Sequence, residues 1–136
     1  MAGMKRFVTY IYAYEEEKKG SNVGFARIEI RGQDARIEIH LRGVYAASAA
    51  CRVYLFQREA SGGKEATGVT GVLVGEMKLA NGSGDGVVVL KGGRVGASPY
   101  GITEMEGLFF VIGEERILMS RWREGAPLIW GPNLFL

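Results

Sequence analysis

Glycine divides this chain into short apolar runs, and this pattern limits the folds that the chain can adopt. There are 21 glycines in 136 residues, about 15% of the chain and roughly twice the average share. They stand singly or in pairs without a three-residue period, which excludes a collagen-like triple helix. Glycine clusters between short apolar runs are typical of turns between strands. We therefore expect an all-β fold of about eight mostly antiparallel strands, in a sandwich or a small barrel.

The strongest local signal is a β-hairpin over residues 24–42. Apolar and charged residues alternate in both 24–31 and 34–42, and only Gly32-Gln33 separates the two runs. Glycine at the first position of a two-residue loop favours a type II′ turn. This turn sets three outward pairs of opposite charge across the hairpin: Arg31 with Asp34, Glu29 with Arg36, and Arg27 with Glu38. A shift of one residue would expose the isoleucines to water, so we expect this register.

Six further strands complete the expected fold: residues 6–14, 51–57, 72–79, 87–90, 108–112 and 116–119. Between them we expect a charged loop over 15–22, an exposed loop over 59–71, and an irregular segment over 92–107. That segment can hold one helical turn, with Thr103 and Glu106 at capping-box spacing. No composition change marks a boundary, so residues 1–136 are expected to form one domain, which could be the N-terminal part of a longer protein.

The composition argues against several classes of protein. The chain has 17 basic and 15 acidic residues, a formal net charge of +2, whereas nucleic-acid-binding proteins usually carry a clustered positive excess. No apolar run is long enough to cross a membrane, and residues 6–14 are better explained as a strand than as a signal peptide. The single cysteine excludes an internal disulfide and favours a reducing compartment. We expect a cytoplasmic domain that binds neither nucleic acid nor membranes.

The side chains that catalysis or metal binding would need are few. His40 is the only histidine, and the hairpin register places it on the outward face near Phe25. A nucleophilic pair would have to combine it with one of three side chains: Cys51, Ser48 or Ser120. No nucleophile motif surrounds any of these. We therefore expect a surface histidine, no catalytic residue, no metal site and no cofactor, and hence no enzyme.

Two other patterns resemble ligand sites only superficially. Residues 81–86 (NGSGDG) alternate possible oxygen ligands as a calcium loop does, but Gly92 stands where such a loop needs its closing glutamate. We expect a plain hairpin loop there. Two pairs of neighbouring carboxylates also fall in expected loops: Glu104 with Glu106, and Glu114 with Glu115. Neither is expected to act as an acid–base pair.

The aromatic residues offer the best candidates for binding. Tyr10, Tyr12 and Tyr14 recur at every second position, so they share one face of the first strand. Tyrosine favours positions with one apolar and one wet end, which fits a half-buried core or a protein interface. A flat row of tyrosines could instead stack on sugar rings and form a carbohydrate-binding platform.

The C-terminal residues are also candidates. Leu134, Phe135 and Leu136 are large and apolar, and a soluble monomer seldom leaves such a patch in water. Gly131-Pro132 would suit a detachable arm just before them. We expect residues 128–136 to pack on a second copy or on a neighbouring domain rather than on their own domain.

Several stretches resemble a known but uncharacterised domain. They are residues 10–15 (YIYAYE), 22–29 (NVGFARIE), 51–56 (CRVYLF), 75–78 (GEMK) and 81–84 (NGSG). The chain resembles a β-rich domain of unknown function in hypothetical proteins of clostridia-like, anaerobic Gram-positive bacteria. The resemblance implies a bacterial protein in which this domain lies near the N-terminus, ahead of other segments. It implies no activity and no catalytic residue.

These observations together favour a non-enzymatic binding or assembly module. Its expected partner is a protein, either another part of the parent chain or a second copy. The binding residues would be Tyr10, Tyr12, Tyr14, Leu134 and Phe135. The alternative is a carbohydrate-binding module that uses the tyrosine face.

Overall fold

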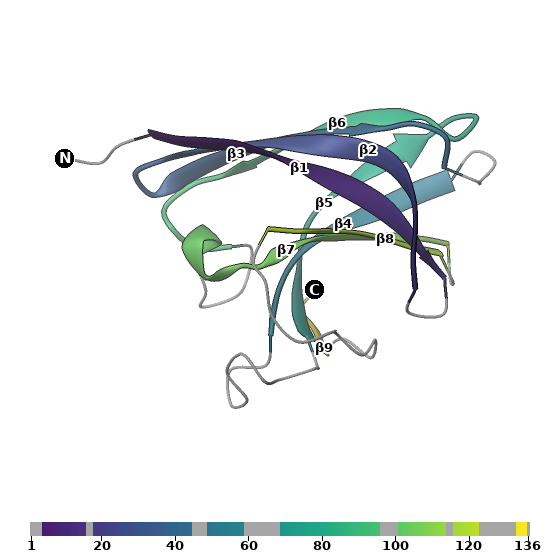
Figure 1. The fold of residues 1–136 in the computed structure, drawn as a ribbon. Coiled ribbons are helices and arrows are strands. Elements are labelled where there is room, and N and C mark those ends of the chain that lie inside the picture. The colour runs from purple at the N-terminus through teal and green to yellow at the C-terminus, as the bar shows by residue number, and fades with distance from the viewer. Residues whose placement is uncertain are drawn as a thin grey trace.

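In the part of the chain that the structure describes, nine strands form one sheet, which is drawn in Figure 1. A computed structural model describes residues 4–15, 18–44, 49–58, 69–95, 101–113, 116–122 and 133–135. The strands are β1 (Met4–Glu15), β2 (Lys18–Arg31), β3 (Asp34–Leu41), β4 (Ala49–Arg58), β5 (Val69–Leu79), β6 (Gly84–Leu90), β7 (Gly107–Ile112), β8 (Arg116–Arg121) and β9 (Asn133–Phe135). The described residues include no α-helix, only the short 3-10 helix η2 (Ile102–Glu104).

The first eight strands curve into a nearly closed antiparallel barrel, which confirms the all-β prediction. The strand order is β6-β3-β2-β1-β8-β7-β4-β5-β9. Figure 1 shows β1, β2, β3 and β6 as an upper layer and β4, β7 and β8 as a lower layer, with β5 rising towards β6. β5 and β6 meet at a tight turn, where Ala80 and Ser83 form an isolated bridge. The barrel therefore closes at this corner without a continuous ladder between β5 and β6.

The hairpin of β2 and β3 has the predicted register. Arg31 pairs with Asp34, and the ladder continues residue by residue to Gly24 and Leu41. Gly32 has φ 60 while Gln33 does not have a positive φ, as a type II′ turn requires. β7 and β8 cover the two strands expected at residues 108–112 and 116–119, and they pair as a hairpin, with Ile112 opposite Arg116.

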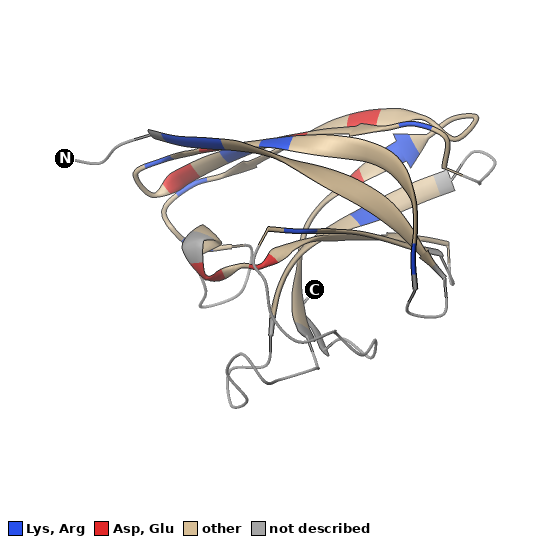
Figure 2. Ribbon diagram, viewed as in Figure 1, with Lys and Arg blue, Asp and Glu red and all other residues tan. Residues whose placement is uncertain are grey.

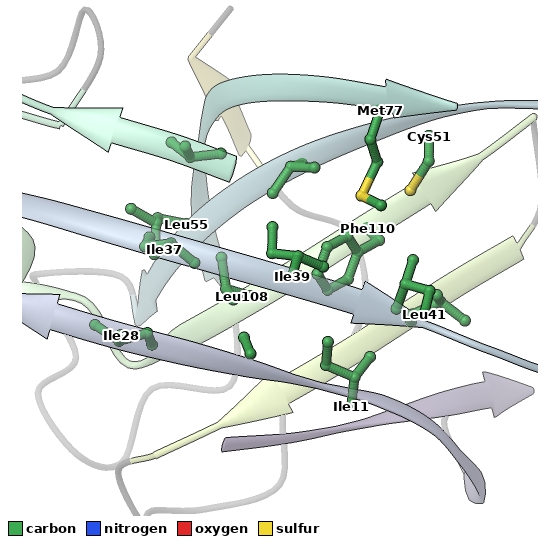
Figure 3. Packing of buried hydrophobic residues seen from close by; sticks show 14 of the residues in the cluster. Ile11, Ile28, Ile37, Ile39, Leu41, Cys51, Leu55, Met77, Leu108 and Phe110 are labelled. Atoms are coloured by element: carbon green, nitrogen blue, oxygen red, sulfur yellow. The ribbon is translucent and has the colours of Figure 1, made fainter. Parts of the chain in front are cut away.

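The barrel interior is a single apolar core. Figure 3 shows side chains of the two layers pointing towards one another, with Ile37, Ile39 and Leu41 of β3 facing Leu108 and Phe110 of β7. All five of these side chains are fully buried. The alternation of β3 explains this arrangement, because every second residue of a strand points to the same face. Removal of this apolar surface from water provides the main driving force for folding.

A second apolar cluster lies on the outer side of the lower layer. It consists of Tyr54, Phe56, Phe109 and Met119, which alternate with the interior residues of β4, β7 and β8. The rings of Tyr54 and Phe109 stack 4.7 Å apart with an interplanar angle of 9°. This cluster explains why residues 51–57 are apolar on both faces.

The structure differs from the sequence-based expectation at several places. The expected loop over residues 15–22 is mostly strand, because β2 begins at Lys18 and pairs with β1 through a bulge near Tyr12. Around η2, the backbone N–H of Gly101 donates to the carboxylate of Glu104, so the cap lies two residues before the predicted one. A ninth strand, β9, joins the edge of β5 in parallel orientation.

The close approach of three strands at Gly107 gives a test of the barrel. A Cβ on this residue would overlap the carbonyl oxygen of Ser120 and lie 3.0 Å from the Cα of Arg121. We expect Gly107→Ala to lower the free energy of unfolding by about 3 kcal/mol or more. Gly86→Ala is the matched control, because the atoms nearest to its Cβ are side-chain atoms of Met77, at 3.3 Å or more, and not backbone atoms. It should cost less than about 1 kcal/mol.

Urea unfolding of both variants measures this difference. Equal costs at the two positions would show that β7 does not approach β8 as closely as described.

Candidate binding face

The outer surface of β1, β2, β3 and β6 is the candidate functional site, and we call it the candidate face. Backbone pairing aligns its outward side chains in rows that cross all four strands. One row is Tyr10, Phe25, His40 and Asp85, the next is Val8, Arg27, Glu38 and Val87, and a third is Arg6, Glu29, Arg36 and Val89. These residues alternate with the core residues of the same strands. The strand pairing that places the core residues inside the barrel therefore also places these residues on the candidate face.

The candidate face holds the exposed apolar side chains of the domain. In the part of the chain that the structure describes, four large apolar side chains are strongly exposed, and all four lie on this face. Their exposed fractions are 48% for Val8, 59% for Tyr10, 53% for Val87 and 55% for Val89. Val8 and Tyr10 lie on β1, and Val87 and Val89 lie on β6. β2 and β3, which carry charged side chains, stand between them, so the two apolar strips are three strand spacings apart, or roughly 14 Å.

Charged side chains fill the space between these apolar strips. Figure 2 shows basic and acidic residues interspersed along the strands of the upper layer. On the described part of the face, seven basic side chains (Arg6, Lys19, Arg27, Arg31, Arg36, Arg42 and Lys91) stand against four acidic ones (Glu29, Asp34, Glu38 and Asp85). Arg27 and Arg36 both lie 3.5 Å from the same carboxylate, that of Glu38. The face therefore carries a small positive excess that its own carboxylates do not balance.

His40 lies at the centre of this charge network. Its Nδ1 is 2.7 Å from Oδ1 of Asp85 on β6, and its Nε2 is 2.9 Å from Oε1 of Glu38 on β3. Arg42 contributes a third contact, with Nη2 3.1 Å from the same oxygen of Asp85. The imidazole also packs beside the ring of Phe25, with centroids 5.0 Å apart. Both ring nitrogens are thus engaged by carboxylates, which holds the imidazole in a fixed orientation.

These contacts shift the pKa values of all three groups. Hydrogen bonds to Asp85 and then to Glu38 favour the charged imidazolium and raise the pKa of His40. The same bonds favour the charged carboxylates, so His40 lowers the pKa of Glu38 and, together with Arg42, that of Asp85. The network is therefore held together most firmly when His40 is protonated and both acids are ionised.

The three candidate tyrosines do not form a flat platform. All three point outward as the alternation predicts, but only Tyr10 is strongly exposed. The ammonium of Lys19 lies 3.9 Å from the ring centroid of Tyr12 and covers part of that ring. Tyr14 packs against the outer cluster of the lower layer, and burial raises the pKa of its hydroxyl. The tyrosine row thus passes from an exposed end into a buried one.

The C-terminal candidates lie on a different part of the domain. Gly71 of β5 pairs with Leu134, and Val72 pairs with Phe135, in a parallel ladder. Figure 1 shows β9 below the lower layer, away from the upper layer that carries Tyr10. In contrast to the expected detachable arm, this part of the tail adds a strand to its own domain. The reason lies in β5, which pairs with β4 along one edge. Its other edge is left unpaired at the end remote from the corner with β6, and β9 pairs there with Thr70, Gly71 and Val72.

The two candidate nucleophiles that the structure describes, Ser120 and Cys51, are not placed beside His40. Ser120 lies inside the barrel, where its hydroxyl hydrogen-bonds to that of Thr9. Cys51 is fully buried, and burial raises the pKa of its thiol to about 12. Ser48 lies outside the described residues, as do Glu114 and Glu115. Among the residues that the structure describes, no cluster of His, Cys, Asp and Glu could hold a metal ion.

The predicted loop at residues 81–86 divides into a turn and the start of a strand. Asn81 and Gly82 have positive φ values and form the turn, while Gly84 begins β6. Asp85 consequently points to the candidate face and binds His40 instead of joining a calcium loop.

Sequence reasoning missed Val8, Val87 and Val89 as surface residues. The run over residues 87–90 (VVVL) has no polar member, so its own pattern does not indicate which valines face solvent. Pairing with β3 decides it, because Val87 aligns with the outward Glu38 and Val88 with the inward Ile37. For Val8, the shared face with Tyr10 was visible in the sequence, but its exposure was not.

The His40 network makes the stability of the domain depend on pH. Because His40 has a raised pKa in the folded state, its contribution is complete below about pH 6.5, the ordinary value, and is lost as pH rises through the folded pKa. The lowered pKa values of Glu38 and Asp85 act in the opposite sense, because their contribution is complete above about pH 4.5 and is lost on acidification. We expect His40→Gln to lower the free energy of unfolding more at about pH 5.5 than at about pH 8.5.

The same network can be tested with a direct titration. The chain has one histidine, so a single NMR resonance reports the pKa of His40. We expect a value above 6.5 that falls in Asp85→Asn, because this substitution weakens the strongest hydrogen bond to the imidazolium. Glu76→Gln, at an exposed site on β5, is the control and should leave the value unchanged. A pKa at or below 6.5 in the unmodified protein would contradict the described network.

No similar protein supplies a function for this face. Comparisons with protein-family models, with curated proteins and with solved structures found no match. The resemblance to a domain of clostridia-like bacteria therefore stays a prediction. A function has to be inferred from the side chains that the domain presents to solvent.

Proposed function

We propose that this domain is a non-enzymatic protein-binding module whose partner docks on the candidate face. One observation carries the proposal: the strongly exposed large apolar side chains of the described chain, Val8, Tyr10, Val87 and Val89, are all gathered there. Single exposed apolar residues are common on protein surfaces, whereas neighbouring ones favour an interaction site, and β1 and β6 each present two such residues on the same side of the strand. The rigid barrel beneath would hold these residues in place, which lowers the entropy lost on binding.

The chemistry of the face fits a protein partner. Tyrosine and arginine are the residue types that contribute most binding energy at protein interfaces, and Tyr10 lies in the row next to Arg27. The surplus of basic side chains favours a partner surface that is acidic between two apolar patches. Such a surface could belong to another part of the parent chain or to a separate protein.

The described side chains give catalysis little support. His40 is engaged at both ring nitrogens by carboxylates, whereas a general base needs a free nitrogen. Cys51 and Ser120 are buried in the barrel, on the opposite side of the sheet from His40. The buried free thiol also fits a reducing, cytoplasmic compartment. In the described segments, no helix is long and apolar enough to cross a membrane.

Carbohydrate binding remains the alternative function. Its support is Tyr10, a residue that is 59% exposed and whose ring could stack on a sugar. Lys19 covers Tyr12 and the outer cluster surrounds Tyr14, so the face offers one accessible tyrosine where a stacking platform would use several.

A photo-crosslinking experiment tests the proposal. We would replace Tyr10 with benzoylphenylalanine and irradiate the domain in an extract of the cells that produce it. The matched control carries the same group at Arg52, an exposed residue of β4 outside the candidate face. We expect a discrete protein adduct from position 10 but not from position 52. Excess unmodified domain should suppress the adduct, whereas a Val8→Ser/Tyr10→Ser competitor should not.

Two results would contradict the proposal. The first is an adduct that forms equally from positions 10 and 52, or that both competitors suppress alike. The second is glycan-array binding that Tyr10→Ser abolishes in the absence of any specific protein adduct, which would favour the carbohydrate alternative.

A further inference from the structure

β6 has one edge that no other described strand pairs with along its length. It pairs with β3 from Gly84 to Leu90, and it stands at one end of the strand order. On the other side of β6, the described backbone hydrogen bonds towards β5 are those of the bridge between Ala80 and Ser83. This bridge lies before Gly84, the first residue of β6. In an antiparallel pair, alternate N–H and C=O groups point away from the partner strand. The free edge of β6 is therefore a template for one more strand.

Between Gly86 and Leu90, this edge lacks three of the features that commonly prevent strand addition. Proteins commonly protect an edge with an inward charge, a proline or a bulge. Residues 86–90 (GVVVL) contain neither a charge nor a proline, and they pair with β3 without a register shift. Val87 and Val89 are more than half exposed beside the edge, and Gly86 is partly exposed.

The sequence of β6 is complementary to itself in one antiparallel register. When two copies pair about a two-fold axis at Val88, Asp85 of one copy lies opposite Lys91 of the other, and Val87 lies opposite Val89. All four side chains lie on the candidate face, since they share its alternation. The two charged groups are accessible, with side chains 58% and 74% exposed. In this register, each charged side chain thus lies opposite one of opposite charge, and each outward valine lies opposite another valine.

We propose that a second copy of this chain binds at the free edge of β6, in antiparallel orientation about a two-fold axis at Val88. Parallel pairing in the same register would place Asp85 opposite Asp85 and Lys91 opposite Lys91, which is unfavourable. The antiparallel arrangement is isologous, so it closes as a dimer and does not continue into a fibre. It also goes beyond the proposed function, because it uses the backbone edge of β6 and joins two candidate faces into one continuous surface.

Association should be weak. One pair of seven-residue strands buries an area at the low end of specific interfaces, so we expect a dissociation constant in the micromolar range. Sedimentation equilibrium from micromolar to near-millimolar protein should show a monomer converting to a dimer, and β6 amides should gain protection from hydrogen exchange as the dimer forms. A monomer over the whole range would overturn the proposal.

A pair of double variants tests the register. Val87→Lys/Val89→Lys places lysine opposite lysine across the two-fold axis, and we expect association to weaken by about 30- to 100-fold. Val87→Lys/Val89→Glu loses the same apolar surface but places lysine opposite glutamate, so it should still dimerise and become sensitive to salt. Within one copy, its new side chains face Glu38 and Arg36 respectively, which favours correct folding. Equal dimerisation of both variants, or of neither, would overturn the proposed register.

Two controls separate this proposal from the proposed function. Thermal unfolding of each variant shows whether the barrel is intact. Val8→Ser/Tyr10→Ser alters β1, three strands away from the free edge, so its dimerisation should equal that of the unmodified domain. Loss of dimerisation in this variant would place the interface on the candidate face and overturn pairing at β6. A failed crosslink at position 10 together with normal dimerisation would reject the proposed function alone.

Discussion

The register between β2 and β3 decides what the upper layer of the barrel presents to solvent. Gly32-Gln33 joins the two strands in a turn that fixes their pairing, and β1 and β6 then pair with the outer edges of this hairpin. A shift by one residue would exchange the interior isoleucines for arginine and glutamate, at a cost that the barrel could not sustain. The core and the candidate face therefore follow from the same two-residue turn.

The two layers of the barrel use their outer surfaces differently. In the lower layer, the outer side of the sheet is buried as well as the inner side, and Tyr54 and Phe109 lie in the buried cluster on the outer side. In the upper layer, charged residues of β2 and β3 stand between exposed residues of β1 and β6. This asymmetry leaves one face on which both apolar and charged groups are accessible. Such a mixed composition is typical of protein–protein interfaces.

The closure between β5 and β6 is incomplete in the described part of the domain, which leaves one edge of each strand outside a continuous ladder. A fully closed barrel has no strand edges, whereas here the ladder ends at the corner of Ala80 and Ser83. β5 uses its own free edge to pair with β9. The corresponding edge of β6 has no partner strand among the described residues, and the charges of Asp85 and Lys91 suit a copy of itself.

The sequence by itself determined the all-β class, the register of the hairpin from 24 to 42, and the side of β1 on which Tyr10 lies. These features depend on residues that are close in the chain, where alternation and turn geometry act directly. Only the tertiary structure decided that Tyr10 is exposed while Tyr14 is half-buried, that Val87 points to solvent, and that His40 lies between Glu38 and Asp85. Each of these depends on which distant strand becomes a neighbour. The alternation within one strand assigns a residue to a side of the sheet, but the strands and loops packed on that side determine whether it is covered.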